Sequence, residues 1–276
     1  MQHAPASTCD AMARAAPQLA SDADGDKRRV DRGEDKGEPG VEQLIANAGA
    51  HDYPFTKAPF APSGPAGTGA MRVAAIHGVP DAATLRDATA CIAAGGTLIF
   101  PTDTVYGIGC DPENSGAVAE IFRLKRRPAD KPLAVHIASP EVASRFARTL
   151  TRCARRIIDS FWPGPIAIVV ERAARIAEPA ALHGATISLR CPDDAACAAI
   201  LRACGPIAAT SANLSGTPAF DGDIADLATL PDATLAIITG PTRLRQESTV
   251  VDCTTDVPRI LREGAVDAAS IERAAR

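Results

Sequence analysis

The chain has 276 residues, of which 46% are hydrophobic and 22% are charged, so it can bury the core of one large or two small globular domains. A formal net charge of −4 argues against a protein that binds nucleic acid over its whole surface, although basic runs at 123–131 and 152–156 could still form one positive face. No stretch approaches the roughly 18 consecutive apolar residues of a membrane-spanning helix, so we expect a soluble chain.

The eight cysteines include no Cys-x-x-Cys pair, and most of them lie in apolar runs, where a thiol behaves as a small buried side chain. The five histidines lack the short spacing of zinc ligands. We therefore expect reduced thiols in a cytoplasmic protein, and no transition metal held by protein ligands.

Residues 1–70 differ in composition from the rest of the chain. They mix Asp, Lys, Arg, Gly and Pro without sustained apolar periodicity. They also lack the positively charged start and apolar region of a secretory signal. We expect a flexible N-terminal extension over 1–70 and a single folded domain over 71–276.

From residue 71 onward, apolar runs of strand length alternate with helix-like stretches, which is typical of an α/β fold. In chain order, strands are expected at 96–100, 132–138, 166–170, 186–191, 206–210, 235–239, 248–253 and 259–262. Helices are expected at 115–124, 140–149, 152–161, 195–203 and 268–275. Trp162–Pro165 predicts a rigid turn between a helix and a strand.

Hydroxyl-bearing residues follow the strand expected at 96–100, in the segment Pro-Thr-Asp-Thr-Val-Tyr-Gly that ends at Gly107. Thr102 and Thr104 are two residues apart, so both hydroxyls could face the same side and bind a small polar ligand, with Tyr106 beneath them. A Ser/Thr turn would explain the same pattern.

Two cations end the helix expected at 115–124. Lys125 and Arg127 lie just before Pro128, which stops the helix, so they could take different oxygens of one polyphosphate while Mg²⁺ takes others. A basic helix end that complements the helix dipole is the alternative. Neither a P-loop motif nor a Gly-x-Gly-x-x-Gly motif is present in the sequence, so any ATP is held in another way.

Other polar groups lie on or after later strands. Ser211 and Asn213 bring a hydroxyl and an amide to a strand end, where they could bind phosphate or carboxylate, or simply form a turn. Arg190 lies in an apolar strand and needs an anionic partner if it is buried, either a substrate carboxylate or an internal Asp or Glu. Arg262 could contact phosphate or form a surface salt bridge.

Together these segments resemble the YrdC-like family of threonylcarbamoyl-AMP synthases over about residues 75 to 266. The family's Lys-x-Arg and Ser-x-Asn signatures are intact as Lys125–Arg127 and Ser211–Asn213. The other matching segments are Pro101–Gly109, Pro128 with Lys131–Leu133, Trp162–Pro165, Thr210–Gly216, Ser248–Asp252 and Leu261–Gly264. The resemblance implies one YrdC-like catalytic domain, with a twisted mixed sheet flanked by helices and an open cleft.

The implied enzyme is a nucleotidyltransferase that condenses L-threonine, bicarbonate or CO₂, and ATP into threonylcarbamoyl-adenylate and pyrophosphate. Mg²⁺ enters with ATP. A separate tRNA threonylcarbamoyl-transferase complex then uses the product to modify the adenosine beside the anticodon. We expect the short, single-domain form of the family, because the chain ends soon after Arg262.

The resemblance also implies roles for individual residues. The threonine pocket would comprise Thr104, His136, Arg190, Ser211 and Ser248. The ATP site would comprise Lys125, Arg127, Lys131, Thr186, Asn213 and Arg262. Lys125 and Arg127 would be the catalytic residues, since they stabilise the departing pyrophosphate. For His136 the alternative is a core histidine that is hydrogen-bonded at a strand end.

Rival interpretations use the same residues differently. A YrdC-like relative without synthase activity could bind a nucleotide or double-stranded RNA through a basic face, with strong salt dependence and no need for threonine. A carbamoyl-transfer domain of the hydrogenase-maturation kind would need accompanying regions for which this sequence has no room.

Overall fold

The computed structural model describes residues 71–276, except residue 129 and residues 175–183. The extension expected over 1–70 lies outside these residues. The strands are β1 (Arg72–Ala75), β2 (Leu98–Phe100), β3 (Gly107–Cys110), β4 (Ala134–His136), β5 (Ile166–Glu171), β6 (Thr186–Arg190), β7 (Ile207–Ser211), β8 (Leu235–Ile238), β9 (Thr249–Asp252) and β10 (Arg259–Arg262). The helices are α2 (Ala82–Ala93), α3 (Ser115–Lys125), α4 (Ala143–Phe146), α5 (Arg152–Phe161), α6 (Ala195–Cys204) and α7 (Ala268–Ala275), with short 3₁₀ helices η1 (Pro140–Val142) and η2 (Ile224–Thr229).

The strands of the described residues form one mixed sheet in the order β1-β8-β2-β3-β7-β4-β6-β5-β9-β10. The central strands β3 and β7 run antiparallel, with Gly107 opposite Ser211. The segment that precedes β3 and the segment that follows β7 therefore lie at the same end of the sheet. This pairing brings together two stretches that are about a hundred residues apart in the sequence.

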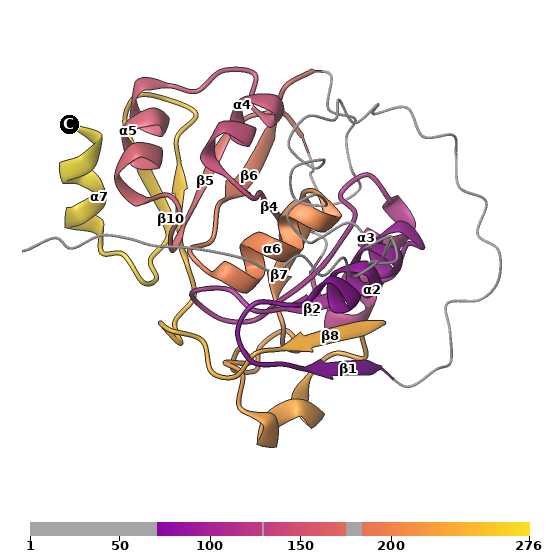
Figure 1. The fold of residues 1–276 in the computed structure, drawn as a ribbon. Helices are drawn as coiled ribbons and strands as arrows, with labels where there is room; N and C mark the ends of the chain where they lie inside the picture. The colour runs from indigo at the N-terminus through magenta and orange to yellow at the C-terminus, as the bar shows by residue number, and fades with distance from the viewer. Residues whose placement is uncertain (1–70, 129, 175–183) are drawn as a thin grey trace, which may run out of the picture. The chain divides into compact units, whose positions relative to one another are not determined.

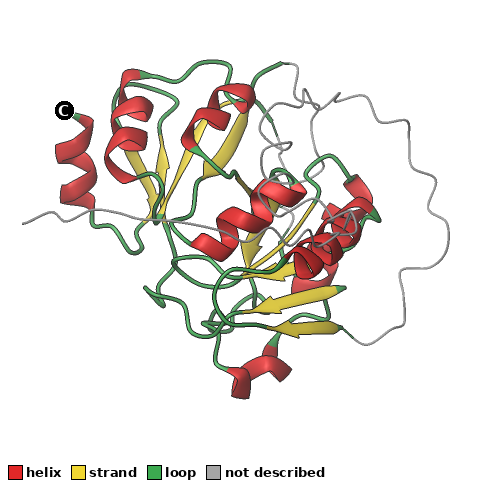
Figure 2. Ribbon diagram, viewed as in Figure 1, coloured by secondary structure: helices red, strands yellow, loops and turns green. Residues whose placement is uncertain are grey.

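Helices cover the sheet from both sides (Figures 1 and 2). Helices α2 and α6 lie side by side and bury Ile92 and Ile200 against Phe100 and Ile237, which face them from β2 and β8. The opposite face packs against α3 and α5 through a larger core, which includes Ile121 and Ile157. Burial of this apolar surface is the main term that stabilises the sheet.

Polar residues set the helix ends. In five helices, the side chain of the residue before the first turn accepts a hydrogen bond from a backbone N–H of that turn. These residues are Asp81 (α2), Asn114 (α3), Thr151 (α5), Asp194 (α6) and Asp267 (α7). Such capping stabilises a helix by about 1 kcal/mol. Helix α3 ends where Arg126 takes the left-handed conformation, with φ of 50°, two residues before Pro128.

The α/β class with a mixed sheet is confirmed, and α5, α7 and β10 have the predicted bounds. The helix predicted over 140–149 is wrong, because the segment splits into η1 and α4 and then leaves the helical path at Ala147, which bridges to Arg172. Strands β1 and β3, helix α2 and η2 were not predicted. Within the described ranges, no helix combines the length and apolar character needed to cross a membrane.

Candidate active site

A cleft of about 1080 Å³ lies over one face of the sheet. Its floor is built from alternate residues of neighbouring strands, which point to the same face. One row of this floor consists of four residues that are paired in register: Ala209 of β7, Ala134 of β4, Ser188 of β6 and Val169 of β5. These side chains are small, so the floor leaves room for a ligand.

The segment before β3 forms one wall of the cleft. Thr102 and Thr104 both line it, as expected from their spacing, and their hydroxyls are 2.9 Å apart. The backbone N–H of Thr104 donates to the hydroxyl of Thr102 at 3.1 Å, so the Ser/Thr turn left as an alternative is also present. The Thr242 hydroxyl donates to the carbonyl of Thr104 at 2.7 Å and fixes the turn from a distant part of the chain.

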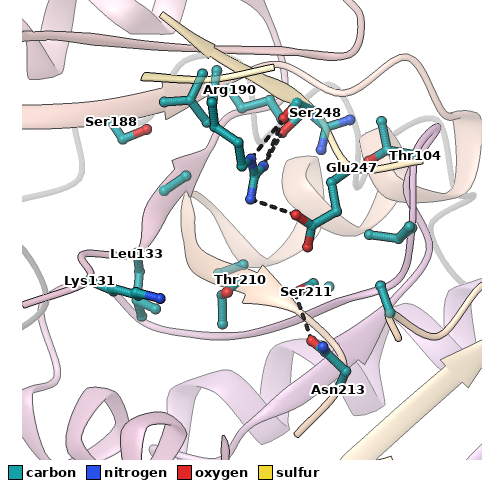
Figure 3. Close-up of a pocket in the computed structure, with 18 of the residues that line it drawn as sticks. Thr104, Lys131, Leu133, Ser188, Arg190, Thr210, Ser211, Asn213, Glu247 and Ser248 are labelled. Carbon is teal, nitrogen blue, oxygen red and sulfur yellow. Dashed lines mark hydrogen bonds and ion pairs between the residues drawn. The ribbon is translucent and has the colours of Figure 1, made fainter. Parts of the chain in front are cut away.

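Lys125 extends from the end of α3 to the segment that follows β7. Its ammonium donates to the carbonyls of Ser211 and Asn213, both at 2.5 Å, and to Asn213 Oδ1 at 2.9 Å. The Ser211 hydroxyl also donates to Asn213 Oδ1, at 2.7 Å (Figure 3). Burial lowers the pKa of Lys125 to about 8. Since all three ammonium protons are engaged, direct contact with phosphate would require one of these bonds to be exchanged.

Arg127 is half-buried and lines the cleft. Its guanidinium donates to the carbonyls of Lys131 and Pro132, both at 2.9 Å, and so holds the loop that leads into β4. Burial, and then the positive charge of Arg262, lower the pKa of Arg127. These two arginines therefore repel each other, and the Glu247 carboxylate, which acts on the pKa of Arg127 in the opposite sense, offsets part of this repulsion. A bound anion would offset it further.

Arg262 ends β10 and lines another wall of the cleft. It forms an ion pair with Glu247 at 2.8 Å and donates to the carbonyl of Ser248 at 2.7 Å. In Figure 3 the Glu247–Ser248 pair and the Ser211–Asn213 pair lie on different sides of the cleft. The salt bridge anticipated for Arg262 is present, and its partner is itself a residue of the cleft.

Arg190 lies at the end of β6 and is only 4% exposed. Its Nη2 donates to Asp103 Oδ1 at 2.5 Å, and its Nε makes a long hydrogen bond of 3.4 Å to the carbonyl of Gly164. The internal carboxylate considered for Arg190 is therefore Asp103. Arg190 still lines the cleft, so it faces both this carboxylate and the ligand space.

His136 lies beside Arg190 in the sheet, because the two residues are paired in register between β4 and β6. Its Nδ1 is 3.1 Å from the carbonyl of Ala134, and its ring meets Phe100 edge to face. Burial, and then the charge of Arg190, lower the pKa of His136 to about 3, so the imidazole is neutral at pH 7. His136 lines the cleft and is also the core histidine at a strand end that was considered as the alternative.

The structure brings all the predicted site residues but one to the same cleft. The predicted residues that line it are Thr104, Lys125, Arg127, Lys131, His136, Arg190, Ser211, Asn213, Ser248 and Arg262. Thr186 does not line the cleft, because it lies at the start of β6, two residues before Ser188, which does. Its assignment to ATP stays a prediction.

Sequence reasoning missed several polar residues, among them Glu247 and Ser188 in the cleft and Asp103 beside it. Glu247 directly precedes Ser248, a predicted residue of the threonine pocket. Its charge beside that residue was the signal that could have placed it in the cleft. Ser188 precedes Arg190 by two residues on the same strand, so period-two alternation would have placed it beside Arg190. Asp103 gave no signal beyond its place between two threonines.

Comparison with known proteins identifies the family. The Sua5/YciO/YrdC family model, described as "Telomere recombination", matches residues 90–264. Threonylcarbamoyl-AMP synthase of Bacillus subtilis is 34% identical over 200 residues, covering 68% of this chain and 55% of that protein. A putative threonylcarbamoyl-AMP synthase of Mycobacterium leprae is 37% identical over 191 residues, covering 68% of this chain and 86% of that protein.

Comparison with solved structures points to the same family as comparison of sequences. The crystal structure of P. abyssi Sua5 complexed with L-threonine superposes with a TM-score of 0.67 at 31% identity, covering 73% of this chain and 60% of that one. The chain thus spans a little more than half of the longer relatives and most of the shorter ones. The matched residues include the whole cleft. The chain belongs to the Sua5/YciO/YrdC family.

Proposed function

We propose that the protein is an L-threonylcarbamoyladenylate synthase, which condenses L-threonine, CO₂ or bicarbonate, and ATP into threonylcarbamoyl-AMP and pyrophosphate. The observation that carries the proposal is a single cleft with two separate sets of cations. Arg127 and Arg262 lie near each other with Lys125 behind them, which suits a polyphosphate. Arg190 lies among hydroxyls and a neutral histidine, which suits one carboxylate.

The relatives support this assignment. The B. subtilis relative is named threonylcarbamoyl-AMP synthase, the M. leprae relative is named a putative one, and the P. abyssi structure is a complex with L-threonine. The product would pass to a tRNA threonylcarbamoyl-transferase complex in the cytoplasm. Mg²⁺ would arrive with ATP as part of the substrate.

The reaction has two steps. The uncharged amine of threonine adds to CO₂ and loses a proton, giving a carbamate. A carbamate oxygen then attacks the α-phosphorus of ATP in line. The bond between the α-phosphorus and the oxygen that bridges to the β-phosphate breaks, and pyrophosphate leaves with that electron pair. The protein contributes by positioning both substrates and by stabilising the charge of pyrophosphate.

Each cation has a distinct part in this scheme. Arg127 and Arg262 bind phosphate oxygens. The ion pair between Arg262 and Glu247 breaks when the phosphates bind. Lys125 fixes the segment that carries Ser211 and Asn213, and it adds a buried positive charge near the triphosphate. Neither Thr104 nor Ser211 is paired with a histidine base in the described residues, so we assign no covalent intermediate.

Pyrophosphate release tests the proposal. The purified protein, with ATP, Mg²⁺ and bicarbonate, should release pyrophosphate with L-threonine and much less with L-serine or without an amino acid. Mass spectrometry should detect threonylcarbamoyl-AMP in the same mixture. A Lys125→Met variant that is purified in parallel, and that should turn over far more slowly, controls for contaminating ATPases. Release that is indifferent to threonine would overturn the proposal, and salt-dependent binding of double-stranded RNA would then favour the RNA-binding alternative.

A further inference from the structure

Asp103 is a buried carboxylate that the proposed reaction does not use. It lies between Thr102 and Thr104, which line the cleft, but it is only 1% exposed and does not line the cleft itself. Its Oδ1 accepts a hydrogen bond from Arg190 at 2.5 Å. Its Oδ2 is the only buried side-chain oxygen or nitrogen without a hydrogen-bond partner in the described part of the chain.

A purely structural role explains this carboxylate poorly. Burial raises the pKa of Asp103, which shows that the surroundings disfavour its charge even beside Arg190. A buried ion pair with an unsatisfied oxygen is often no more stable than a well-packed apolar pair. The pair must therefore be explained by what it does to Arg190.

The donors of Arg190 show what that effect is. Nε is directed to the carbonyl of Gly164, and Nη2 is directed to Asp103. Nη1 makes no hydrogen bond to any described residue. It is also not one of the buried side-chain atoms that lack a partner, so it is accessible. Arg190 lines the cleft, and Nη1 is the guanidinium nitrogen that its described hydrogen bonds leave available to a ligand. The carboxylate of Asp103 thus fixes the guanidinium and leaves one amino group for a ligand.

The position of Asp103 is itself fixed from outside its own turn. The backbone N–H of Leu244 donates to the carbonyl of Asp103 at 3.0 Å. The Thr242 hydroxyl donates to the next carbonyl, that of Thr104, at 2.7 Å. These two bonds come from one distant segment and hold the backbone on which the carboxylate stands.

We propose that Asp103 is a positioning residue for the amino-acid substrate: it orients Arg190 so that Nη1 binds the substrate α-carboxylate. The inference rests on the proposed function and adds a residue that selects for an amino acid without touching it. ATP binds through other cations, so Asp103 should affect amino-acid binding and leave ATP binding unchanged.

Two substitutions of Asp103 separate this role from a structural one. Asp103→Leu removes the acceptor and should raise KM for L-threonine about 10-fold to 100-fold, as expected when a hydrogen bond to a charged group is lost. Asp103→Asn keeps one acceptor oxygen and should give an intermediate increase. KM for ATP should stay within about 2-fold of wild type in both variants. Asp87→Leu, which removes from α2 the carboxylate of an exposed pair with Arg72, away from the cleft, is the matched control and should change neither KM.

A double-mutant cycle shows whether Asp103 acts through Arg190. If it does, Asp103→Leu should add nothing to the rise in threonine KM caused by Arg190→Met, and the double variant should match Arg190→Met. Additive effects, parallel rises in both KM values, or an unchanged threonine KM in the Asn and Leu variants would overturn the proposal. If Asp103→Leu does not fold, Asp103→Asn alone decides the question.

The wild-type protein decides the proposed function separately. Threonine-dependent pyrophosphate release by wild type supports the synthase, whatever the variants do. L-threonine should also raise the melting temperature of wild type without ATP, and Asp103→Asn should need about 10-fold more threonine for the same shift. A wild type that neither releases pyrophosphate nor responds to threonine overturns both the function and this inference. An active wild type with normal threonine binding by Asp103→Asn overturns only the inference.

Discussion

Replacing Lys125 with Met should separate the stability of the fold from the chemistry of the cleft. The substitution keeps an unbranched side chain of similar length and removes the ammonium. Among described donors, Asn213 O receives a hydrogen bond only from Lys125. Ser211 O keeps the Asn213 N–H, and Asn213 Oδ1 keeps the Ser211 hydroxyl. One orphaned acceptor costs about 1–3 kcal/mol of stability.

An opposing effect comes from the desolvation of the ammonium. Burial lowers the pKa of Lys125 from an ordinary 10.5 to about 8. This shift corresponds to roughly 3 kcal/mol against the charged form in the folded state. A methionine relieves that cost, so the two effects nearly cancel. We expect the free energy of unfolding to change by no more than about 2 kcal/mol in either direction.

The activity should respond very differently. Without the ammonium, the Ser211–Asn213 segment loses its side-chain hydrogen bonds to α3, although the Ser215 N–H still donates to the Lys125 carbonyl, and the cleft loses a positive charge. We expect kcat to fall on the order of 100-fold or more. Urea unfolding and threonine-dependent pyrophosphate release, measured on the same preparation, would give both numbers. Arg126→Met removes an exposed cation from the neighbouring position and should leave both unchanged.

Two results would refute this reasoning. Turnover close to wild type would show that neither the charge of Lys125 nor its hydrogen bonds matter for the reaction. Loss of activity together with a loss of stability far above 2 kcal/mol would show that Lys125 acts through the fold.

Three further predictions concern other parts of the molecule. Arg127→Gln should raise KM for ATP about 10-fold or more and leave KM for threonine within about 2-fold in initial-rate measurements, whereas equal rises would contradict its assignment to phosphate. His136 stays neutral when folded but takes a proton below about pH 6.5 when unfolded. Wild type should therefore lose stability between pH 6 and 4 more steeply than His136→Gln, by about 1.4 kcal/mol per pH unit in urea titrations, and equal slopes would refute the shift. Gly109→Ala places a Cβ 2.4 Å from Ile207 Cγ2 and should cost about 1–3 kcal/mol by thermal unfolding. Gly116→Ala, in α3, places a Cβ 3.4 Å from Asn114 Oδ1, which is an ordinary contact, and should stabilise by about 0.5–1 kcal/mol. Similar melting temperatures for the two glycine variants would contradict the packing around β3.

The sequence predicted most of the elements whose apolar periodicity is strong. In helix α5 the buried pairs Cys153–Ala154 and Ile157–Ile158 flank the pair Arg155–Arg156, which is a helical period, and the predicted bounds are those observed. Strand β3 was missed because its sequence, Gly-Ile-Gly-Cys, has two glycines, which have low strand propensity. It forms a strand because β2 and β7 pair with it along both edges, and that is a tertiary effect.

The candidate site was predictable to the extent that residue types point to chemistry. The motifs placed the cations and hydroxyls in one cleft, but not their partners. Lys125 and Asn213 are 88 positions apart, and Asp103 and Arg190 are 87 apart. Such pairs are set by the register of the sheet, and nothing local in the sequence encodes them. For the same reason, sequence reasoning considered Lys125 a ligand for phosphate and did not foresee that its protons are engaged.

The row of small residues on the cleft floor determines which strands a bound substrate protects from amide hydrogen exchange. Ala209, Ala134, Ser188 and Val169 come from four strands, and their order across the sheet differs from their order in the chain. No partly folded form that lacks one of these strands keeps the floor. Saturating substrate should therefore slow amide hydrogen exchange throughout β4, β5, β6 and β7 together, because exchange that requires global opening must first release the ligand.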